Sequence, residues 1–274
     1  MNNWAIILGA SSGIGAACAQ SLAKKGINIY GVYLRKKQHE IDTLKQTIES
    51  QGVKTIFQKG NAANEEIIKL AIEELSGIPQ INIKMLVHSI AFGTLKPMIS
   101  TDNNHLNKKN LDMTLDIMSN SLLYWSQAIF KNNLFSKGSQ IIGMTSAGGR
   151  KNWNSYGAVS LAKSGLESIC RQLSLEFAPY KIGVNAIQAG VTDTAALRKI
   201  PGSEQMIKQA INSNPHQRLT TPHDIGEIIA LLADYKSSWN RQRRFSEIWR
   251  QSISFRSLVS WPRSSAHKHF RIGR

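Results

Sequence analysis

A tyrosine and a lysine lie seven residues apart in the middle of the chain, and their side chains could act as a proton-donating pair. Tyr156 and Lys163 belong to a segment that we expect to open a helix. Seven residues at about 100° each bring both side chains to one face, roughly 10 Å apart along the axis. The phenol can then meet a substrate oxygen, and the lysine charge favours hydrogen donation by the phenol. Such a pair taken alone is usually two surface residues, so the elements that position it decide its meaning.

A glycine-rich segment near the N-terminus is typical of a phosphate-binding loop. The first apolar run leads directly into residues 9–15, GASSGIG, and a helical pattern follows. Glycine lets the backbone approach a ligand closely, and the free N–H groups at the start of a helix attract a pyrophosphate. A strand before the loop and a helix after it are the context that a dinucleotide site requires. We expect the pyrophosphate to contact Gly9, Ser11, Ser12, Gly13, Ile14 and Gly15. A glycine-rich turn without a ligand is the alternative.

The end of the second predicted strand distinguishes between the two nicotinamide cofactors. An NAD site usually has Asp or Glu there, which binds the ribose hydroxyls. This chain has Arg35, Lys36 and Lys37 instead. A guanidinium binds phosphate through two hydrogen bonds, so Arg35 favours NADPH over NADH; a solvated basic start of a helix is the alternative. Asn61 and Ala62, after the third strand, are expected beside the adenine.

Alternating strands and helices predict the scaffold. Short apolar runs at residues 4–8, 27–34, 53–58, 83–89, 140–145 and 182–188 predict strands. Helical patterns, such as those at residues 16–25 and 64–75, separate them. The alternation predicts a single doubly wound α/β domain of Rossmann type, with a parallel sheet flanked by helices. We place this NAD(P)-binding domain at residues 1–235.

The composition changes after residue 235. The chain has 274 residues and a net charge of +16, which on its own would indicate a nucleic-acid partner. Ten of the basic residues but only one acidic residue fall within residues 236–274. The charge is therefore concentrated in a tail, and we expect no nucleic-acid partner for the domain. A shift of the reading frame explains such a tail better than a genuine segment that binds nucleic acid or anionic lipid, which is the alternative.

Several protein classes are excluded by the same composition. No apolar run reaches the roughly 18 residues of a membrane helix, and no signal-peptide pattern opens the chain, so we expect no membrane partner. Two cysteines, Cys18 and Cys170, cannot form a disulfide framework, which favours a reducing, cytoplasmic setting. No Cys/His cluster has metal-ligand spacing, so we expect no metal.

Together, the glycine loop, the alternating pattern and the Tyr/Lys segment resemble the short-chain dehydrogenase/reductase superfamily. The common superfamily spacing is Tyr-x3-Lys, which would place the lysine at position 160, where this chain has Ser160. The observed spacing, Tyr156-x6-Lys163, resembles the enoyl-acyl-carrier-protein reductases of fatty-acid synthesis. The loop at residues 9–15 is the general superfamily loop, and with Arg35 it indicates the branch that uses NADPH.

Three further segments carry the resemblance to the enoyl reductases. They are VHSIA at residues 87–91, DIMS at residues 116–119 and the segment 214–226 before the last predicted helix. The first of them contains His88, whose place at a strand end favours a structural role over that of a general acid. The resemblance covers residues 1 to about 238.

The resemblance implies an activity and a set of roles. NADPH would deliver hydride to C3 of a trans-2-enoyl thioester, carried by acyl carrier protein or CoA. Tyr156 would hydrogen-bond the thioester oxygen, and Lys163 would hold the nicotinamide ribose. The cofactor would also contact Ser89, Ile90, Ala91, Val191, Thr192 and Thr194. Residues 195–211 would form a lid over the acyl chain, and Phe92, Trp153 and Met206 are candidates for its apolar lining.

Ser146 leaves a second activity open. It stands ten residues before Tyr156, where enoyl reductases often have another tyrosine, and it equally resembles the serine of a carbonyl reductase. A 3-oxoacyl-thioester or general carbonyl reductase, with Ser146 and Tyr156 as catalytic residues, is therefore the alternative activity. A non-catalytic nucleotide-binding protein or a basic nucleic-acid binder is the alternative from another class.

The end of the chain departs from the superfamily. Members normally close the sheet with a final strand that also builds subunit contacts. Residues 236–274 contain no pattern for such a strand. A homo-oligomer is therefore expected only if the C-terminus is intact.

Overall fold

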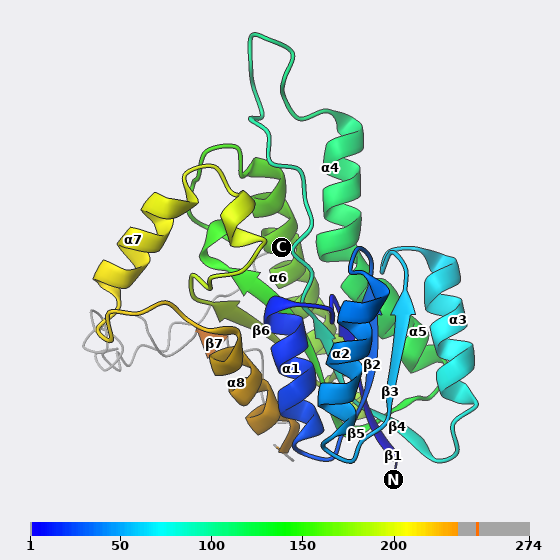
Figure 1. The fold of residues 1–274 in the computed structure, drawn as a ribbon. Helices are drawn as coiled ribbons and strands as arrows, with labels where there is room; N and C mark the ends of the chain where they lie inside the picture. The colour runs from blue at the N-terminus through cyan, green and yellow to red at the C-terminus, as the bar shows by residue number, and fades with distance from the viewer. Residues whose placement is uncertain (1, 235–244, 247–274) are drawn as a thin grey trace, which may run out of the picture.

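A parallel sheet with helices on both faces forms the core of the protein (Figure 1). The computed structural model describes residues 2–234, 245 and 246. The strands of this part are β1 (Asn2–Leu8), β2 (Asn28–Tyr33), β3 (Thr55–Lys59), β4 (Ile81–His88), β5 (Phe135–Ser146), β6 (Gly183–Ala189) and β7 (Phe245–Ser246). Their order in the sheet is β3-β2-β1-β4-β5-β6-β7, and all pairs are parallel. The predicted single α/β domain of Rossmann type is confirmed.

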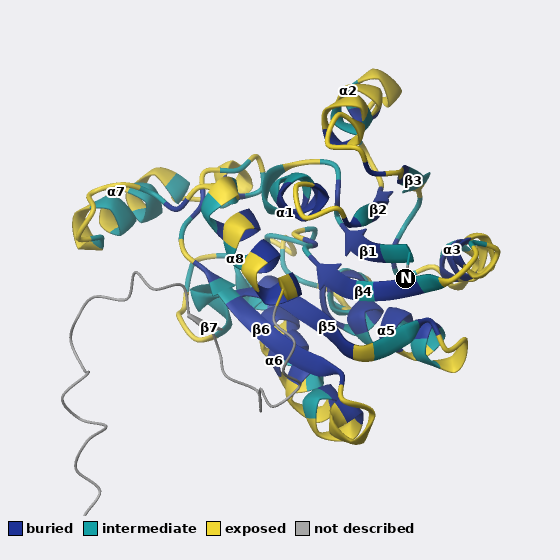
Figure 2. Ribbon diagram, turned by 90° about the horizontal axis from the view of Figure 1, so that it is seen from below, coloured by how far each residue is buried: buried dark blue, intermediate teal, exposed yellow. Residues whose placement is uncertain are grey.

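The helices divide between the two faces of the sheet, as Figure 2 shows. The main helices are α1 (Gly13–Ala23), α2 (Gln38–Glu49), α3 (Glu65–Ser76), α4 (Lys108–Leu115), α5 (Ser121–Lys131), α6 (Gly157–Phe177), α7 (Ser203–Ser213) and α8 (Pro222–Asp234). Four short helical turns accompany them: η1 (Asp116–Asn120), η2 (Ala147–Gly149), η3 (Ala178–Tyr180) and η4 (Leu197–Lys199). Apolar side chains of α1, α2 and α8 pack on one face, and those of α3, α5 and α6 pack on the other.

The strand order explains where a ligand can bind. From β1, the chain first builds outward to β2 and β3, and then crosses over to β4, β5 and β6 on the other side. At this reversal the loops after β1 and β4 lead to opposite faces, which opens a crevice beyond the carboxyl ends of the strands. Strands covered on both faces must be apolar throughout, and Ile6, Ile7 and Leu8 of β1 are fully buried.

Two strands differ from expectation. β5 begins at Phe135, five residues before the predicted start at 140, because its register against β4 shifts between Ile83 and Met85. Residues 136–139 of that extension, SKGS, carry no strand pattern. In the tail, where no strand was expected, Phe245–Ser246 pairs with Ile187 and Gln188 of β6. The open edge of β6 offers unpaired backbone groups, so two residues can pair there without a strand pattern in the sequence.

The remaining expectations about the tail cannot be compared with the structure. Residues 235–244 and 247–274 lie outside the described part of the chain. The domain boundary at residue 235, the shifted reading frame and the homo-oligomer stay predictions. Among the described residues, no helix is long and apolar enough to cross a bilayer, and no group of His, Cys, Asp and Glu side chains could hold a metal ion.

A buried tryptophan joins α5 to the loop after β3. The side chain of Trp125 is fully buried, and its Nε1 donates a hydrogen bond of 2.8 Å to the carbonyl of Ala62. Trp125→Phe leaves that carbonyl without its partner and a void beside it. We expect a loss of about 1–3 kcal/mol in the free energy of unfolding, measured by urea denaturation. Leu231→Ala on the exposed side of α8 is the control, with an expected change within about 0.5 kcal/mol. Equal effects of the two variants would contradict the account.

Candidate active site

The residues predicted to bind and react converge on the crevice at the carboxyl ends of the strands. Residues 9–15 follow β1, residues 89–91 follow β4, and Ser146 ends β5. Residues 191–194 follow β6, and the pair Tyr156 and Lys163 lies at the start of α6. Because all these strands run parallel, their carboxyl ends share one edge of the sheet. The structure therefore brings together segments that are far apart in the sequence.

The glycine loop is packed so closely that side chains are excluded from it. Gly9 has a φ of +88°, and a Cβ there would lie 2.5 Å from the carbonyl oxygen of Ser89. A Cβ on Gly15 would collide with the backbone of Gly9. Ser12 precedes α1 in an extended conformation, and its side chain makes no capping hydrogen bond. The first N–H groups of α1 thus keep their capacity for an anion, which a pyrophosphate can use.

Lys163 is a buried cation fixed by two carbonyl groups. Its Nζ donates to the oxygen of Met144 in β5 at 2.7 Å and to the oxygen of Ile90 after β4 at 3.3 Å. Burial lowers the pKa of Lys163 to about 8. Three protons are available on an ammonium and the two carbonyls use two of them, so one remains for a ligand. The ends of β4 and β5 therefore determine where this charge lies.

Tyr156 caps α6, whereas the sequence predicted it inside the helix. Its φ of −99° and ψ of 3° lie outside the helical region, and Ser155 before it has a φ of +57°. The N–H of Tyr156 donates to the carbonyl of Trp153 at 3.2 Å, and its ring packs directly against Gly148. Burial raises the pKa of Tyr156, while a hydrogen bond with Ser146 lowers it. The phenol therefore stays protonated near neutral pH and can donate a hydrogen bond.

Two consecutive glycines bring the predicted pair together. Gly148 contacts the Tyr156 ring, and a Cβ on Gly149 would lie 3.5 Å from the Cβ of Lys163. Ser146 stands two residues before them, and its Oγ accepts a hydrogen bond of 3.3 Å from the N–H of Gly148. The side chains of residues 146, 156 and 163 thus surround one short turn, η2.

His88 lies in the interior behind this site. It is fully buried, and its Nε2 lies 2.9 Å from Oγ of Ser121, whose own proton goes to the carbonyl of Ile117 at 2.8 Å. His88 must therefore be the donor in this hydrogen bond. Burial, together with the nearby charge of Lys163, lowers the pKa of His88 to about 3. A neutral, buried imidazole fits the structural role that its position suggested.

Arg35 and Phe92, for which the sequence suggested separate roles, are in contact. The guanidinium carbon of Arg35 lies 4.1 Å from the centre of the Phe92 ring. Arg35 is exposed beyond the end of β2, and Phe92 is half-buried in the loop after β4. Of the two residues expected near the adenine, Asn61 accepts a hydrogen bond from Ala63 at 3.0 Å, and Ala62 is buried.

The segment after β6 approaches the glycine loop from the other side. A Cβ on Gly13 would lie 3.3 Å from Cγ2 of Thr194, whose Oγ1 accepts the N–H of Leu197 at 3.2 Å. Thr192 is buried and forms a β-bridge with Thr220. Val191, the third residue expected at the cofactor from this segment, is half-buried beside Thr192. The segment 191–194 is thus placed against the first turn of α1.

Two contacts that hold the loop 147–155 were not foreseen. Nε1 of Trp153 donates a hydrogen bond of 2.7 Å to the carbonyl of Pro201, which precedes α7. Arg150 forms an ion pair of 3.5 Å with the buried carboxylate of Glu167 on α6, which also accepts from Thr145 at 2.9 Å. Glu167 lies one helical turn after Lys163, and this spacing is the feature of the sequence that could have indicated its place beside the site. The loop that carries Tyr156 is thereby fastened to α6 and to the predicted lid.

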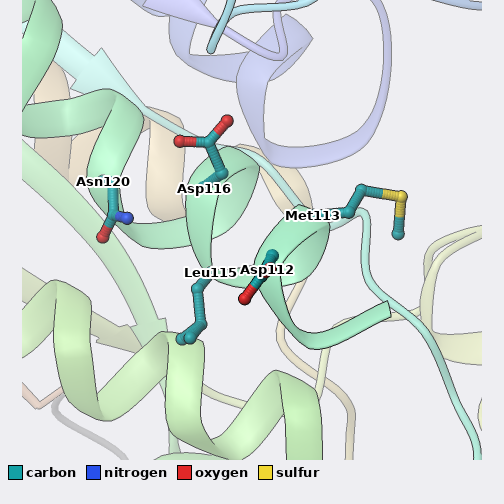
Figure 3. A pocket seen from close by; sticks show the side chains of 5 residues that line it. All are labelled: Asp112, Met113, Leu115, Asp116 and Asn120. Atoms are coloured by element: carbon teal, nitrogen blue, oxygen red, sulfur yellow. The ribbon is translucent and has the colours of Figure 1, made fainter. Parts of the chain in front are cut away.

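The π-helix η1 was also missed, although residues 116–119 were singled out for another reason. Such turns contain an extra residue and are frequent at functional sites. The phenol of Tyr124 donates a hydrogen bond of 2.9 Å to Asp116 in this turn. An open hollow of about 380 Å³ lies beside this turn. It is lined by Asp112, Met113, Leu115, Asp116 and Asn120, whose side chains Figure 3 shows. None of the predicted site residues lines this hollow, so the crevice at the strand ends remains the candidate site.

Comparison with known proteins agrees with this arrangement. The family model described as Enoyl-(Acyl carrier protein) reductase matches residues 9–240. The chain therefore belongs to this family, within the short-chain dehydrogenase/reductase superfamily.

Individual relatives are distant. The enoyl-[acyl-carrier-protein] reductase [NADH] of Enterococcus faecalis is 26% identical over 233 residues, which cover 84% of this chain and 90% of the relative. A short-chain dehydrogenase of Burkholderia cenocepacia, solved in complex with NADP, has a TM-score of 0.75 at 21% identity, covering 90% of this chain and 96% of that one. The 3-oxoacyl-[acyl-carrier protein] reductase of Brucella melitensis, solved with NAD, has a TM-score of 0.72 at 21% identity, covering 85% and 90%. The two structures support the fold.

The buried ammonium makes a prediction about pH. The pKa of Lys163 lies at about 8 in the folded protein, below its ordinary value of 10.5. Between these two pH values the unfolded chain binds more protons than the folded protein does. The loss of unfolding free energy caused by the buried charge is therefore complete below pH 8 and disappears as the pH rises toward 10.5. Relative to Lys163→Met, the wild type should gain up to about 3 kcal/mol of unfolding free energy across this range, measured by urea denaturation.

A change in the same helix that involves no charge serves as the control for Lys163→Met. The difference between the wild type and Leu161→Met should not depend on pH. A difference between the wild type and Lys163→Met that stays constant from pH 8 to 10.5 would show that the ammonium is not perturbed by burial.

The contact between Trp153 and Pro201 should hold the lid closed. Trp153→Phe keeps a ring but removes the hydrogen bond, whose net value is about 1 kcal/mol. We expect roughly fivefold faster tryptic cleavage after Arg198, Lys199 and Lys208, followed by mass spectrometry. Asn154→Ala, an exposed change in the same loop, is the control. Cleavage at the wild-type rate in Trp153→Phe would mean that this hydrogen bond does not restrain the lid.

Proposed function

We propose that the protein reduces the C2=C3 double bond of trans-2-enoyl thioesters with NADPH. The observation that carries the proposal is the position of Lys163. It follows Tyr156 by seven residues, and its ammonium is held by the carbonyls of Ile90 and Met144 at the ends of two neighbouring strands. This distance of seven positions separates the chain from relatives that have the lysine four positions after the tyrosine.

The residues around the crevice fit a dinucleotide. Glycines 9 and 15 let the loop pack directly against the end of β4 and against its own backbone. The first N–H groups of α1, which Ser12 does not cap, would bind a pyrophosphate. Lys163 would hold the ribose of the nicotinamide with its remaining proton. Further contacts would come from Ser89, Ile90, Ala91, Val191, Thr192 and Thr194 to the nicotinamide half and from Asn61 and Ala62 to the adenine. When bound, NADPH supplies the hydride.

Tyr156 would stabilise the charge that develops on the substrate. As C3 of the enoyl group gains a hydride, negative charge moves to the thioester oxygen, and a phenol in hydrogen-bond reach stabilises this enolate. The raised pKa of Tyr156 keeps its proton on the oxygen, so it acts as a donor. The ammonium of Lys163 would add a positive charge beside the bound ribose. The hydrogen bond from Trp153 to Pro201 joins the loop 147–155 to the segment before α7. These two segments would keep water away from the reacting atoms.

The preference for NADPH depends on Arg35. It stands just beyond β2, where an acidic residue would favour NADH. The relative from Enterococcus faecalis is named as an NADH enzyme, so this preference is a proposal about this chain's own residue.

The thioester would be delivered by acyl carrier protein or by CoA. Lys199 and Lys208 are exposed on the lid, whereas the neighbouring Arg198 is paired with Asp193 at 2.6 Å. Two exposed cations at the mouth of the site would attract an acidic carrier protein or the phosphates of CoA.

A carbonyl reductase remains the second candidate because of one contact. The hydroxyl of Ser146 lies close enough to Tyr156 to lower the pKa of its phenol. A serine and a tyrosine placed side by side could each turn their proton toward a ketone oxygen. The substrate of this alternative would be a 3-oxoacyl thioester.

Two substitutions separate the candidates. With NADPH and crotonyl thioester, Tyr156→Phe should lower kcat by about 10²–10³, the usual effect of losing one donor to an oxyanion. Ser146→Ala should change kcat by less than about tenfold. Tyr180→Phe, on an exposed ring far from the crevice, is the matched control and should behave as wild type. Faster turnover of acetoacetyl thioester, lost in both Ser146→Ala and Tyr156→Phe, would favour the carbonyl reductase.

A further inference from the structure

The helix α6 holds the short turn η2 from both ends. The carboxylate of Glu167 accepts a hydrogen bond of 2.9 Å from Oγ1 of Thr145, just before the turn. The same carboxylate lies 3.5 Å from the guanidinium of Arg150, just after the turn. Between these two contacts, Oγ of Ser164 donates a hydrogen bond of 2.8 Å to the carbonyl of Gly149. One side chain of α6 therefore grips the two ends of η2.

The members of this group differ in exposure. The side chain of Glu167 is only 6% exposed and that of Arg150 is 57% exposed, whereas Thr145 is buried. A carboxylate inside a protein is unfavourable unless charged or hydrogen-bonding groups compensate it. The chain thus accepts a buried charge at a place where an apolar residue could have packed. Arg150 reaches this charge from the surface, so it can be replaced without opening the core.

The turn η2 limits where the ring of Tyr156 can lie. The N–H of Tyr156 donates to the carbonyl of Trp153, a contact that holds the backbone but leaves the side chain able to rotate. The ring itself lies against Gly148, where a Cβ would be 2.4 Å from Cε1 and 3.2 Å from Cζ, the carbon that carries the phenol oxygen. A shift of η2 away from α6 would remove this support.

We propose that Glu167 is a positioning residue for Tyr156. By holding Thr145 and Arg150, it keeps η2 against the phenol ring and fixes the direction in which the phenol donates its proton. Glu167 acts through the turn and touches neither substrate nor cofactor. The inference rests on the proposed role of Tyr156 as the hydrogen-bond donor to the substrate oxygen.

Positioning has a kinetic signature that differs from substrate binding. A displaced donor weakens an interaction that forms in the transition state, so it lowers kcat and leaves KM nearly unchanged. A cation that attracts the thioester or its carrier would instead raise KM when it is removed. Arg150 and the exposed Lys151 beside it allow the two roles to be separated, because each carries one positive charge in the same loop.

The first test is steady-state kinetics of the full chain with NADPH and crotonyl thioester. Arg150→Met should lower kcat by about tenfold and change KM by less than about twofold. Arg150→Lys keeps the charge opposite the carboxylate and should recover most of the rate. Lys151→Met is the matched control, since it removes the same charge one position further on, and it should behave as wild type.

A second variant attacks the same contact from the buried side. Glu167→Gln keeps the size of the side chain and an acceptor for Thr145 but removes the charge that faces Arg150. Its kcat should fall to about the level of Arg150→Met. The double variant should be no slower than either single variant, because all three lack the same interaction.

The phenol itself gives a readout that needs neither substrate nor cofactor. Burial raises the pKa of Tyr156. In Arg150→Met the loosened turn should expose the ring and lower this pKa, although the loss of a nearby cation would by itself raise it. The pKa is measured by ¹⁹F NMR on protein labelled with fluorotyrosine, and Tyr156→Phe assigns the signal. Lys151→Met should show no fall.

Four outcomes would overturn the inference. They are wild-type kcat in Arg150→Met, an equal loss in Lys151→Met, a change confined to KM, and a phenol pKa that does not fall in Arg150→Met. Failure of the proposed function looks different, because the wild type would then not reduce crotonyl thioester, while the comparison of phenol pKa values would still decide whether the turn positions Tyr156.

Discussion

The site depends on one buried ammonium. Lys163 is held by carbonyl oxygens at the ends of β4 and β5, and burial moves its pKa well below the ordinary value. A cation can be kept there only if the helix that carries it packs closely on the sheet. Gly143 of β5 allows this, because a Cβ there would lie 2.8 Å from Sγ of Cys170 on α6. The position of the charge is therefore set by backbone packing rather than by a salt bridge.

The same charge organises its neighbours. Together with burial, which has the larger effect, it lowers the pKa of His88, which stays neutral and donates a hydrogen bond to Ser121. The phenol of Tyr156, which caps the same helix, is kept protonated by burial. The loop between these residues is fastened at Arg150 by Glu167 and at Trp153 by the carbonyl of Pro201. Charge, phenol and loop thus lie together at the carboxyl ends of the strands, next to the glycine loop.

Much of the fold could be predicted because strands covered on both faces must be apolar, and β1 and β2 show this most directly. The start of β5 could not, since its first residues are polar and pair through a shifted register. The two residues of β7 could not either, because their pairing depends on the free edge of β6 and not on a local pattern. Local sequence reports burial well and register poorly.

The candidate site shows the same division. The spacing of Tyr156 and Lys163 predicted both within one helix, whereas Tyr156 caps this helix and Ser155 before it has a positive φ. The contact of Arg35 with Phe92 joins two loops 57 positions apart, and no local pattern announces it. The same holds for Trp153 and Pro201. Residue types and spacings indicated which segments gather at the crevice, whereas long-range contacts between loops determine how these segments are held.

The most direct test of the account follows the hydride itself. The full chain is given NADPH deuterated at the transferred position, together with equal amounts of a trans-2-enoyl and a 3-oxoacyl thioester of the same length, and the products are separated by mass spectrometry. The account predicts that deuterium appears in the saturated thioester, and that Tyr156→Phe removes it. Deuterium found only in the 3-hydroxyacyl thioester would contradict the assignment of this site to enoyl reduction.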